Sequence, residues 1–519
     1  MDKQLRRAGK FAAQARLAVC AGQPVKVWEL AGFYMALLMF VAYPLVVVNH
    51  PPLQDYANHL ARMYILQHSD IAPLYYYYQI EWNAIPNLAM DATVPLLGKV
   101  LTLAQAGKIY VLFMFILLTS GPMFLHWVLY RQLSAIPLLS FFFLYNMALQ
   151  KGFLNFLGGC GLAIWVLAVW LWLRDKTSVV RLSVGTMISG LVYFAHLHAF
   201  GVYAIVVIAY EMASVNWHSG RLCKEKFKTI WPTLLHLVPW TVLFLSVTVP
   251  GSRGAGHWSY GVLHKVLVGW TLFPSYQGIF DWAGTVLLVS GIALALNRRW
   301  VRLDSRIAWG LGALMLLVLI LPGKMLGGAN GDWRLIIPVA FIASGAVRLE
   351  GARSETYGTA MAAGMLFLMV MLRVTFVTSQ WKAADKYYSD FVKVVQFCER
   401  GSRLFTAVVD MTYDEATIQL GLLHLPAFGV IERQLFIPTL FAGVMHQPIT
   451  YRSNMLPVVQ QNGPSDTFYG FDGRLPCEHV QREYDYLLLI DKEDNSETKA
   501  CGLQRISKAG ALELYRVRR

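Results

Sequence analysis

The first long apolar segment of the chain is followed by His50-Pro51-Pro52-Leu53-Gln54-Asp55-Tyr56-Ala57-Asn58-His59-Leu60-Ala61-Arg62. The two prolines end the preceding helix, because proline lacks an amide donor and restricts the residue before it. Apolar side chains then recur at Leu53, Tyr56, Leu60, Met63 and Tyr64. This helical spacing predicts a short amphipathic helix that lies along a membrane surface. Asp55 stands at its start, where the helix dipole favours a carboxylate. Two interpretations follow for Asp55: a helix cap, or a catalytic base at the mouth of a membrane cavity.

The composition excludes a soluble globular protein. Of the 519 residues, 56% are hydrophobic and 15% are charged, whereas an ordinary soluble domain has about 25% charged residues. The net charge of +14 would favour a nucleic-acid partner in a soluble protein. Here most Lys and Arg residues fall in alternate loops, as the positive-inside rule describes. We therefore expect membrane lipids as partners, and no nucleic acid.

The N-terminal segment, residues 1–27, is polar and basic, without the apolar core and cleavage site of a signal peptide. We expect it to be cytoplasmic and the first helix to be retained. A membrane-spanning helix needs about 20 apolar residues, and on that basis about eleven segments qualify. They are Trp28–Asn49, Ile109–Tyr130, Pro137–Leu149, Phe156–Leu173, Leu182–His196, Leu197–Met212, Pro232–Pro250, Trp282–Leu296, Ile307–Leu321, Trp333–Val347 and Thr359–Val377. Each inner connection contains Lys or Arg, so the odd number of spans puts the C-terminal part on the far side of the membrane.

The sequence thus predicts a polytopic α-helical membrane protein in three parts. Residues 1–27 form a cytoplasmic segment, 28–379 the transmembrane domain, and 380–519 a small extracytoplasmic α/β domain. In the last part, strands are predicted at 404–409, 486–490 and 512–517, and helices at 391–400 and 416–423. In the first outer loop, Asn83, Asn87 and Asp91 recur every four residues, which predicts a second amphipathic surface helix.

Ionisable side chains in the outer connections are candidate functional groups, because charge is costly at membrane depth. They are Asp55, His59, Arg62, Asp91, Lys151, His196, His198, Arg253, His257, Lys324, Asp332 and Arg334. We expect them to converge on one outward-facing cavity. The inner side carries mainly cations. This asymmetry argues against an alternating-access transporter, whose polar site lies near the bilayer midplane.

The arrangement resembles the GT-C superfamily of membrane glycosyltransferases over the topology of about residues 28–380. The shared features are a long amphipathic outer loop after the first helix, an Asp near its start, about eleven spans and an extracytoplasmic C-terminal domain. Members include protein O-mannosyltransferases, the aminoarabinose transferases of lipid A and the catalytic subunit of oligosaccharyltransferase, and they use polyprenyl-phosphate-linked sugars. The family often has an Asp-Glu pair in this loop. Asp55 matches the Asp, and Tyr56 stands where Glu would be.

The resemblance implies a role for each candidate residue. Asp55 would be the catalytic base, which accepts the proton of an acceptor hydroxyl or amine. Arg334 would bind the lipid phosphate, because a guanidinium fits phosphate oxygens; the alternative is an anchor at the membrane interface. The other substrate-binding candidates are His59, Arg62, Asn87, Asp91, Lys151, His198 and His257. No cofactor is predicted, although some family members hold a divalent cation at the acidic site, which Asp55 and Asp91 could provide.

Two further features concern the outer side. The glycine-rich stretch 251–256 lacks the Lys-Ser/Thr of a nucleotide-binding loop and is interpreted as a flap or a plain connector. In an oxidising compartment we predict a disulfide between Cys477 and Cys501, with Cys398 as a rival partner.

The function predicted is transfer of a sugar from a polyprenyl-phosphate carrier to an unknown acceptor on the outer face of a bacterial inner membrane, with the C-terminal domain in the periplasm. The alternative is a lipid-linked sugar flippase or a non-catalytic envelope assembly protein. A flippase would need polar residues through the interior of the bundle, where this sequence has mostly Leu, Val, Phe and Gly.

Overall fold

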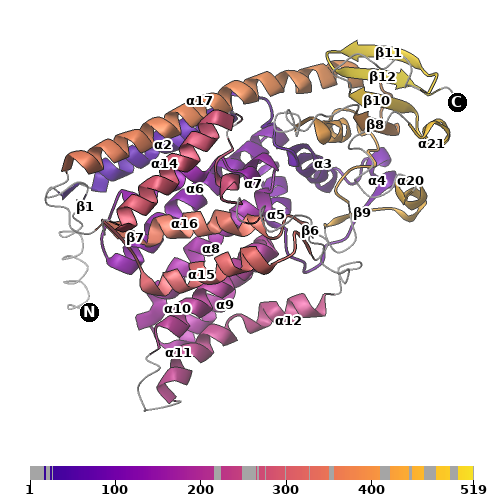
Figure 1. Ribbon diagram of the computed structural model, residues 1–519. Helices are drawn as coiled ribbons and strands as arrows, with labels where there is room; N and C mark the ends of the chain where they lie inside the picture. Colours follow the sequence, from indigo (N-terminus) through magenta and orange to yellow (C-terminus); the bar gives the residue numbers. More distant parts are fainter. Residues whose placement is uncertain are drawn as a thin grey trace. The chain divides into compact units, whose positions relative to one another are not determined.

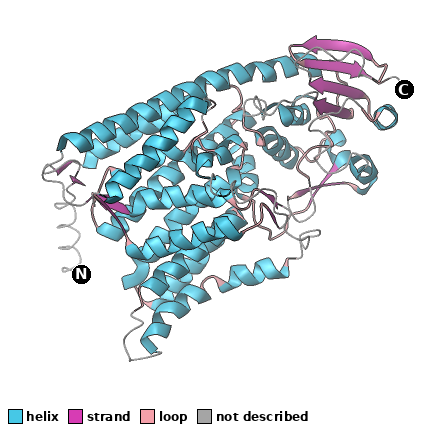
Figure 2. Cartoon of the chain, in the orientation of Figure 1, coloured by secondary structure: helices cyan, strands magenta, loops and turns pink. Residues whose placement is uncertain are grey.

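Helices make up most of the computed structural model, as Figure 2 shows. The structure describes residues 17–18, 24–25, 27–215, 224–247, 265, 268–274, 276, 278–297, 300–325, 328–349, 356–408, 421–442, 447–460, 475–490 and 501–517. The chain divides into two units. The first comprises Met1–Tyr43, Leu112–Ala148 and Leu154–Phe376, and the second Pro44–Val111, Leu149–Phe153 and Val377–Arg519.

The first unit is a bundle of apolar helices, labelled in Figure 1. Four of its helices, α2, α6, α7 and α17, extend into the second unit. The helices are α2 (Val27–Val47), α6 (Leu103–Tyr130), η1 (Ile136–Phe143), α7 (Met147–Gln150), α8 (Leu154–Trp172), η2 (Leu173–Asp175), α9 (Ser178–Ala195), α10 (Leu197–Ala213), α11 (Lys224–Leu235), α12 (Val238–Ser246), η3 (Val268–Leu272), α14 (Gly278–Asn297), α15 (Ser305–Ile320), η4 (Trp333–Leu335), α16 (Ile336–Ala346) and α17 (Thr356–Val395). Short strand pairs join β1 (Leu17–Ala18) to β2 (Pro24–Val25), β4 (Val301–Leu303) to β7 (Val347–Leu349) and β5 (Lys324–Met325) to β6 (Gly328–Ala329).

Among the described residues, four helical segments are long and apolar enough to cross a membrane: Val27–Val47, Leu103–Tyr130, Leu154–Asp175 and Ser178–Ala195. At the centre of the bundle, α10 packs against α8 and α15, and α8 packs against α9. The buried Glu211 carboxylate links α10 to its neighbours α8, η2 and α9, because it accepts hydrogen bonds from Trp170 at 3.3 Å, Arg174 at 3.1 Å and Arg181 at 2.5 Å. Burying a charge in this way requires such partners.

Three of the predicted spans differ from the structure. The segment 137–149 is formed by the 3-10 helix η1 and the short helix α7. The segment 232–250 is broken, since α11 ends at Leu235 and α12 begins at Val238. The last span does not end near Val377, because α17 continues to Val395 and includes the first part of the predicted helix 391–400. Helix and strand periodicity do not reveal such breaks and extensions, and the number of eleven spans stays a prediction.

The second unit contains a four-stranded sheet in the order β11-β12-β10-β8. Its strands are β8 (Leu404–Val408), β10 (Tyr486–Ile490), β11 (Gln504–Ala509) and β12 (Leu512–Arg516). The neighbours β8 and β10 are parallel, and β12 runs antiparallel to β10 and β11. The three predicted strands are confirmed, whereas β11 was not predicted because its polar sequence lacks an apolar face. Cys477, in α21 (Cys477–Glu483), forms the predicted disulfide with Cys501.

The first outer segment belongs to this same unit. It contains α3 (Tyr56–Gln67), α4 (Ala72–Tyr77), β3 (Tyr78–Ile80) and α5 (Ala89–Leu97). The C-terminal segment supplies η6 (Leu425–Ala427), α19 (Phe428–Arg433), β9 (Ile449–Tyr451), η7 (Ser453–Met455) and α20 (Leu456–Gln460). Strand β3 pairs with β9, and α3 packs against α19 and η6. The segment that contains Asp55 therefore packs together with C-terminal elements in one unit.

For both helices predicted on the membrane surface, the structure differs from the prediction. Helix α3 forms as predicted, but protein covers it on nearly every side, including its polar residues Asn58, His59 and Arg62. The spacing of Asn83, Asn87 and Asp91 does not mark a helix, since α5 begins only at Ala89. Asn87 has a φ of 77°, a left-handed backbone conformation that no α-helix contains.

Candidate active site around Asp55

The chain turns into α3 at Asp55, which occupies the position before the first helical residue. The Asp55 side chain makes no capping hydrogen bond to the helix. Instead, Tyr56 N donates to Leu53 O over 3.1 Å and closes a turn that the two prolines precede. The carboxylate is thus not used to cap the helix, although it lies near the positive end of the α3 dipole.

A second segment of chain fixes the backbone of Asp55. Gln54 N donates to Gln150 O at 2.9 Å, and Asp55 N donates to Lys151 O at 3.2 Å. Gly152 follows with a φ of +77°, and a Cβ at this position would stand 2.7 Å from Asp55 N. Only glycine fits both this backbone conformation and this close approach.

Two basic side chains lie beside the Asp55 carboxylate. His424 Nε2 is 3.6 Å from Asp55 Oδ1, and both residues are buried. Lys151 lies close enough for its charge to act on both of them: burial lowers the pKa of Lys151, and the charge of Asp55 opposes that shift. Such a buried carboxylate flanked by potential donors is suited to move a proton.

The buried side chains of Arg62, Asp91 and His59 form a hydrogen-bonded chain that ends at the carbonyl of Gly152. Arg62 Nε and Nη2 donate to the two carboxylate oxygens of Asp91 at 2.5 and 3.0 Å, and both side chains are fully buried. Arg62 Nη2 also lies 3.2 Å from His59 Nδ1, while His59 Nε2 lies 3.2 Å from Gly152 O. Arginine can only donate, so His59 accepts at Nδ1 and donates from Nε2 to the Gly152 carbonyl.

This assignment makes His59 a neutral side chain that supports Gly152. Burial, and next the charge of Arg62, lowers the pKa of His59 to about 3. Both oxygens of Asp91 are occupied by Arg62. Across the described residues, no group of three or more His, Cys, Asp or Glu side chains could hold a metal ion. In this structure the Asp91 carboxylate is thus paired with Arg62 through both of its oxygens.

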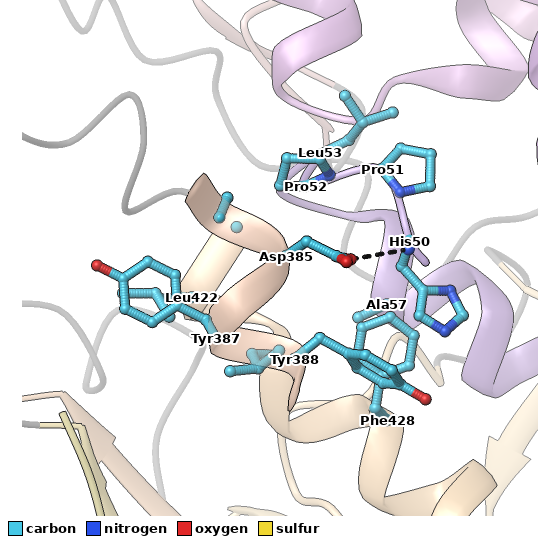
Figure 3. Close-up of a pocket in the computed structure, with 13 residues that line it drawn as sticks. His50, Pro51, Pro52, Leu53, Ala57, Asp385, Tyr387, Tyr388, Leu422 and Phe428 are labelled. Atoms are coloured by element: carbon cyan, nitrogen blue, oxygen red, sulfur yellow. Dashed lines mark hydrogen bonds between the residues drawn. The ribbon is translucent and has the colours of Figure 1, made fainter. Parts of the chain in front are cut away.

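Within the second unit, Asp385 binds the two residues Asn49 and His50, which follow the end of α2. Its carboxylate accepts hydrogen bonds from Asn49 N at 2.9 Å, Asn49 Nδ2 at 2.8 Å and His50 N at 3.4 Å; Figure 3 shows the last of these. A cavity of about 30 Å³ lies here, lined in part by the rings of His50, Tyr388 and Phe428. That space holds about one water molecule and no sugar.

A second set of candidates lies in the first unit. Arg334, in η4, is buried, and its guanidinium carbon lies 5.9 Å from the centre of the Phe156 ring. The Arg334 charge also acts on His196 and His198. At the start of α10, His198 N donates to His196 Nδ1 at 3.1 Å. Arg334 is therefore packed inside the protein and does not serve as an exposed interface anchor.

The remaining candidates separate as follows. Asp91 lies in α5, and Asn87 lies in the preceding loop. His257 and the stretch 251–256 lie outside the described residues. His424 is the residue that sequence reasoning missed. A lone histidine far along the chain from Asp55 gave no motif, and the only signal was its position in a short apolar stretch ending in Pro426.

Comparisons with known proteins agree with the fold. No family model and no curated protein sequence matches the chain. The crystal structure of ArnT from Cupriavidus metallidurans bound to undecaprenyl phosphate superposes with a TM-score of 0.52 and 11% identity, covering 95% of this chain and 98% of that one. The apo state of the same ArnT superposes with a TM-score of 0.46 and 12% identity, covering 93% of this chain and 98% of that one. The chain therefore shares its overall fold with the first of these ArnT structures over nearly its whole length, which agrees with the fold that the resemblance predicts.

Proposed function

We propose that this chain is a membrane glycosyltransferase that moves a sugar from a polyprenyl-phosphate carrier to an acceptor on the outer face of the membrane. The observation that carries the proposal is the setting of Asp55, whose carboxylate is not used to cap its helix and lies beside Lys151 and His424 in a chain with the ArnT fold. That ArnT structure was determined with undecaprenyl phosphate bound.

The reaction assigns each group a task. An oxygen of Asp55 accepts the proton of the acceptor hydroxyl or amine as that atom attacks the anomeric carbon. The bond from the anomeric carbon to the phosphate oxygen breaks, and the lipid phosphate leaves with the electron pair. Cations then stabilise the phosphate. Lys151, beside the carboxylate, is one candidate for this task, and Arg334 is another. A neutral His198 would contribute a hydrogen bond to the phosphate and no charge.

The side of the membrane on which the reaction takes place is also a proposal. The Cys477–Cys501 disulfide supports an outer position for the second unit, because structural disulfides persist in oxidising compartments. The alternate loops rich in Lys and Arg support the same orientation.

The test is Asp55→Asn in membranes of cells that express the chain. Undecaprenyl-phosphate-linked glucose, mannose and 4-amino-4-deoxyarabinose, each radiolabelled in the sugar, serve separately as donors, and label leaving the lipid fraction is counted. We expect at least one donor to be used by the wild type, with a loss of about 100-fold or more in the variant. Asp70→Asn is the matched control, since Asp70 is exposed just beyond the end of α3.

Two results would oppose the proposal. Full transfer by Asp55→Asn at equal protein level would exclude Asp55 as the base. Movement of an intact fluorescent polyprenyl-phosphate sugar across proteoliposomes, without release of sugar from any donor, would favour the flippase alternative.

A further inference from the structure

His424 is held against Asp55 from an element far along the chain. It directly precedes η6, is 8% exposed, and places Nε2 3.6 Å from Asp55 Oδ1. Its other nitrogen, Nδ1, is buried and has no hydrogen-bond partner in the part of the chain that the structure describes. The ring packs edge-on against Phe441, with the ring centres 5.1 Å apart.

The segment that carries His424 is fixed to the Asp55 stretch on both sides. Before His424, a Cβ at Gly421 would lie 3.3 Å from Pro52, so the two backbones are close. After it, Phe441 N donates to Asn58 Oδ1 over 3.2 Å. The position of His424 relative to Asp55 is therefore set by contacts that do not involve its own ring.

The charge state of His424 decides whether the nitrogen that faces Asp55, Nε2, carries a proton. The ionisable groups around it are Asp55 at the start of α3, His59 one turn later and Lys151 on the adjacent segment. Burial, followed by the charge of Lys151, lowers the pKa of His424 to about 4. At neutral pH the ring thus carries one N–H. An ionised carboxylate only accepts hydrogen bonds, so this N–H belongs on Nε2.

We propose that His424 is a positioning residue for the catalytic carboxylate. Its Nε2–H donates to Asp55 Oδ1, which keeps the carboxylate ionised and turns Oδ2 toward the proton of the acceptor. The separation of 3.6 Å closes to hydrogen-bond range when substrates bind, as catalytic hydrogen bonds often tighten only then. The inference rests on the proposed function of Asp55 and adds to it that the C-terminal segment completes the site.

The three variants His424→Gln, His424→Asn and His424→Leu separate this role from mere packing. A glutamine amide nitrogen reaches about as far as Nε2, whereas an asparagine amide nitrogen reaches only as far as Nδ1. We expect His424→Gln to keep transfer within about tenfold of wild type. His424→Asn and His424→Leu should lose about 100-fold in kcat, the effect of a catalytic group misplaced by about 1 Å.

The pH profile of kcat is the second readout, which a structural role would not change. Without the Nε2 donor the ionised carboxylate is less favoured, so the acid limb moves to higher pH by about one unit in His424→Asn and His424→Leu. In His424→Gln the acid limb should stay at the wild-type pH. His68→Leu is the control, since His68 lies at the other end of α3 and its ring bonds through Nδ1 to Tyr64 O within that same helix.

The assay uses whichever undecaprenyl-phosphate-linked sugar the wild type consumes, and thermal unfolding in detergent confirms that each variant is folded. Asp55→Asn is measured in parallel. If it retains transfer, the proposed function of Asp55 fails. If it is inactive while His424→Asn and His424→Leu keep wild-type kcat and acid limb, the inference on His424 fails by itself. A folded His424→Gln as inactive as His424→Leu also overturns it, because a donor at Nε2 would then not suffice.

Discussion

Gly152 approaches Asp55 so closely that a Cβ on Gly152 would lie 2.7 Å from the Asp55 backbone nitrogen. This contact joins two segments that are separated in the sequence by all the elements from α3 to α7. It sets the backbone of the proposed base, and it leads to the first prediction.

Gly152→Ala should reduce sugar transfer at least tenfold, because the new methyl group displaces Asp55 and the φ of +77° costs an L-residue about 1–2 kcal/mol. The initial rate of transfer and the melting temperature in detergent are measured together. Gly201→Ala, where nothing lies within 4 Å of the added Cβ, should leave both unchanged or raise stability slightly. A Gly152→Ala enzyme with the wild-type rate would show that the contact does not set the position of Asp55.

The buried pair of Arg62 and Asp91 should be strongly coupled. Removing one partner in Arg62→Met or Asp91→Leu leaves an unpaired buried charge and should cost about 3–5 kcal/mol of stability. The double variant Arg62→Met/Asp91→Leu should be less destabilised than the sum of the two, because no charge remains. Melting temperatures of the three variants test this, and strictly additive shifts would contradict it.

Arg334 should contribute to binding of the lipid phosphate. Arg334→Ala should weaken binding of undecaprenyl phosphate about tenfold or more, the value of a charge-assisted hydrogen bond. Arg334→Lys keeps the charge without the planar fork and should fall between the two. Quenching of intrinsic tryptophan fluorescence by the lipid in detergent gives the affinity. Arg400→Ala, at an exposed position of the second unit, is the control; equal affinity of all four proteins would remove Arg334 from the site.

The stability of the second unit should fall in weak acid. Burial lowers the pKa of His59 to about 3 and those of His50 and His424 to about 4, whereas an unfolded histidine titrates near 6.5. Below about pH 6.5 the unfolded chain therefore binds protons that the folded chain does not, and stability is lost as the pH falls toward the folded-state values. Above pH 7 these three histidines are neutral in both states, so they should cause no further change in stability with pH.

The measurement is the melting temperature between pH 8 and pH 5, which should drop by a few degrees below pH 6.5. His50→Gln should show a smaller drop, because one of the three histidines no longer titrates. His50 is a suitable choice, since burial and the charge of Lys108 lower its pKa and its Nδ1 has no hydrogen-bond partner within the described ranges. An identical slope in both proteins would mean that other groups control the acid sensitivity.

The Cys477–Cys501 disulfide closes a 24-residue separation and should stabilise the second unit by about 2–4 kcal/mol. Reduction, or the pair Cys477→Ser/Cys501→Ser, should lower the melting temperature and speed proteolysis near the C-terminus. The free and buried Cys398 gives the control Cys398→Ala, which should not respond to reductant differently from wild type. Alkylation of Cys477 and Cys501 in the unreduced, denatured protein would disprove the disulfide.

The features that could be predicted from the sequence are those with a local cause. Long apolar runs predicted the helices, apolar stretches such as Tyr486–Ile490 predicted strands, and the prolines at 51 and 52 placed the turn before α3. The sequence marks Asp55 as a candidate because ionisable groups are costly at membrane depth. The fold is set by these patterns, which repeat every two or every 3.6 residues.

The site depends on contacts between distant segments, which no local pattern encodes. The sequence predicts that α3 lies along a membrane surface, but its polar side chains Asn58 and Arg62 bond to Phe441 and Asp91 inside the protein. Nothing in the spacing of His424 indicates its proximity to Asp55. Equally, the regular spacing of Asn83, Asn87 and Asp91 was coincidental, because Pro86 lies between them and is followed by a left-handed residue.

The joining of Pro44–Val111 and Val377–Arg519 in one unit has a consequence for biosynthesis. Ribosomes add about 5–20 residues per second, so α3 leaves the ribosome tens of seconds before the segment that covers it. During that interval its buried side chains, Arg62 among them, have only their local partners. The nascent first loop should therefore be a client of chaperones on the side of the membrane where it emerges, and a chain that stops before residue 421 should be degraded even with its membrane helices intact.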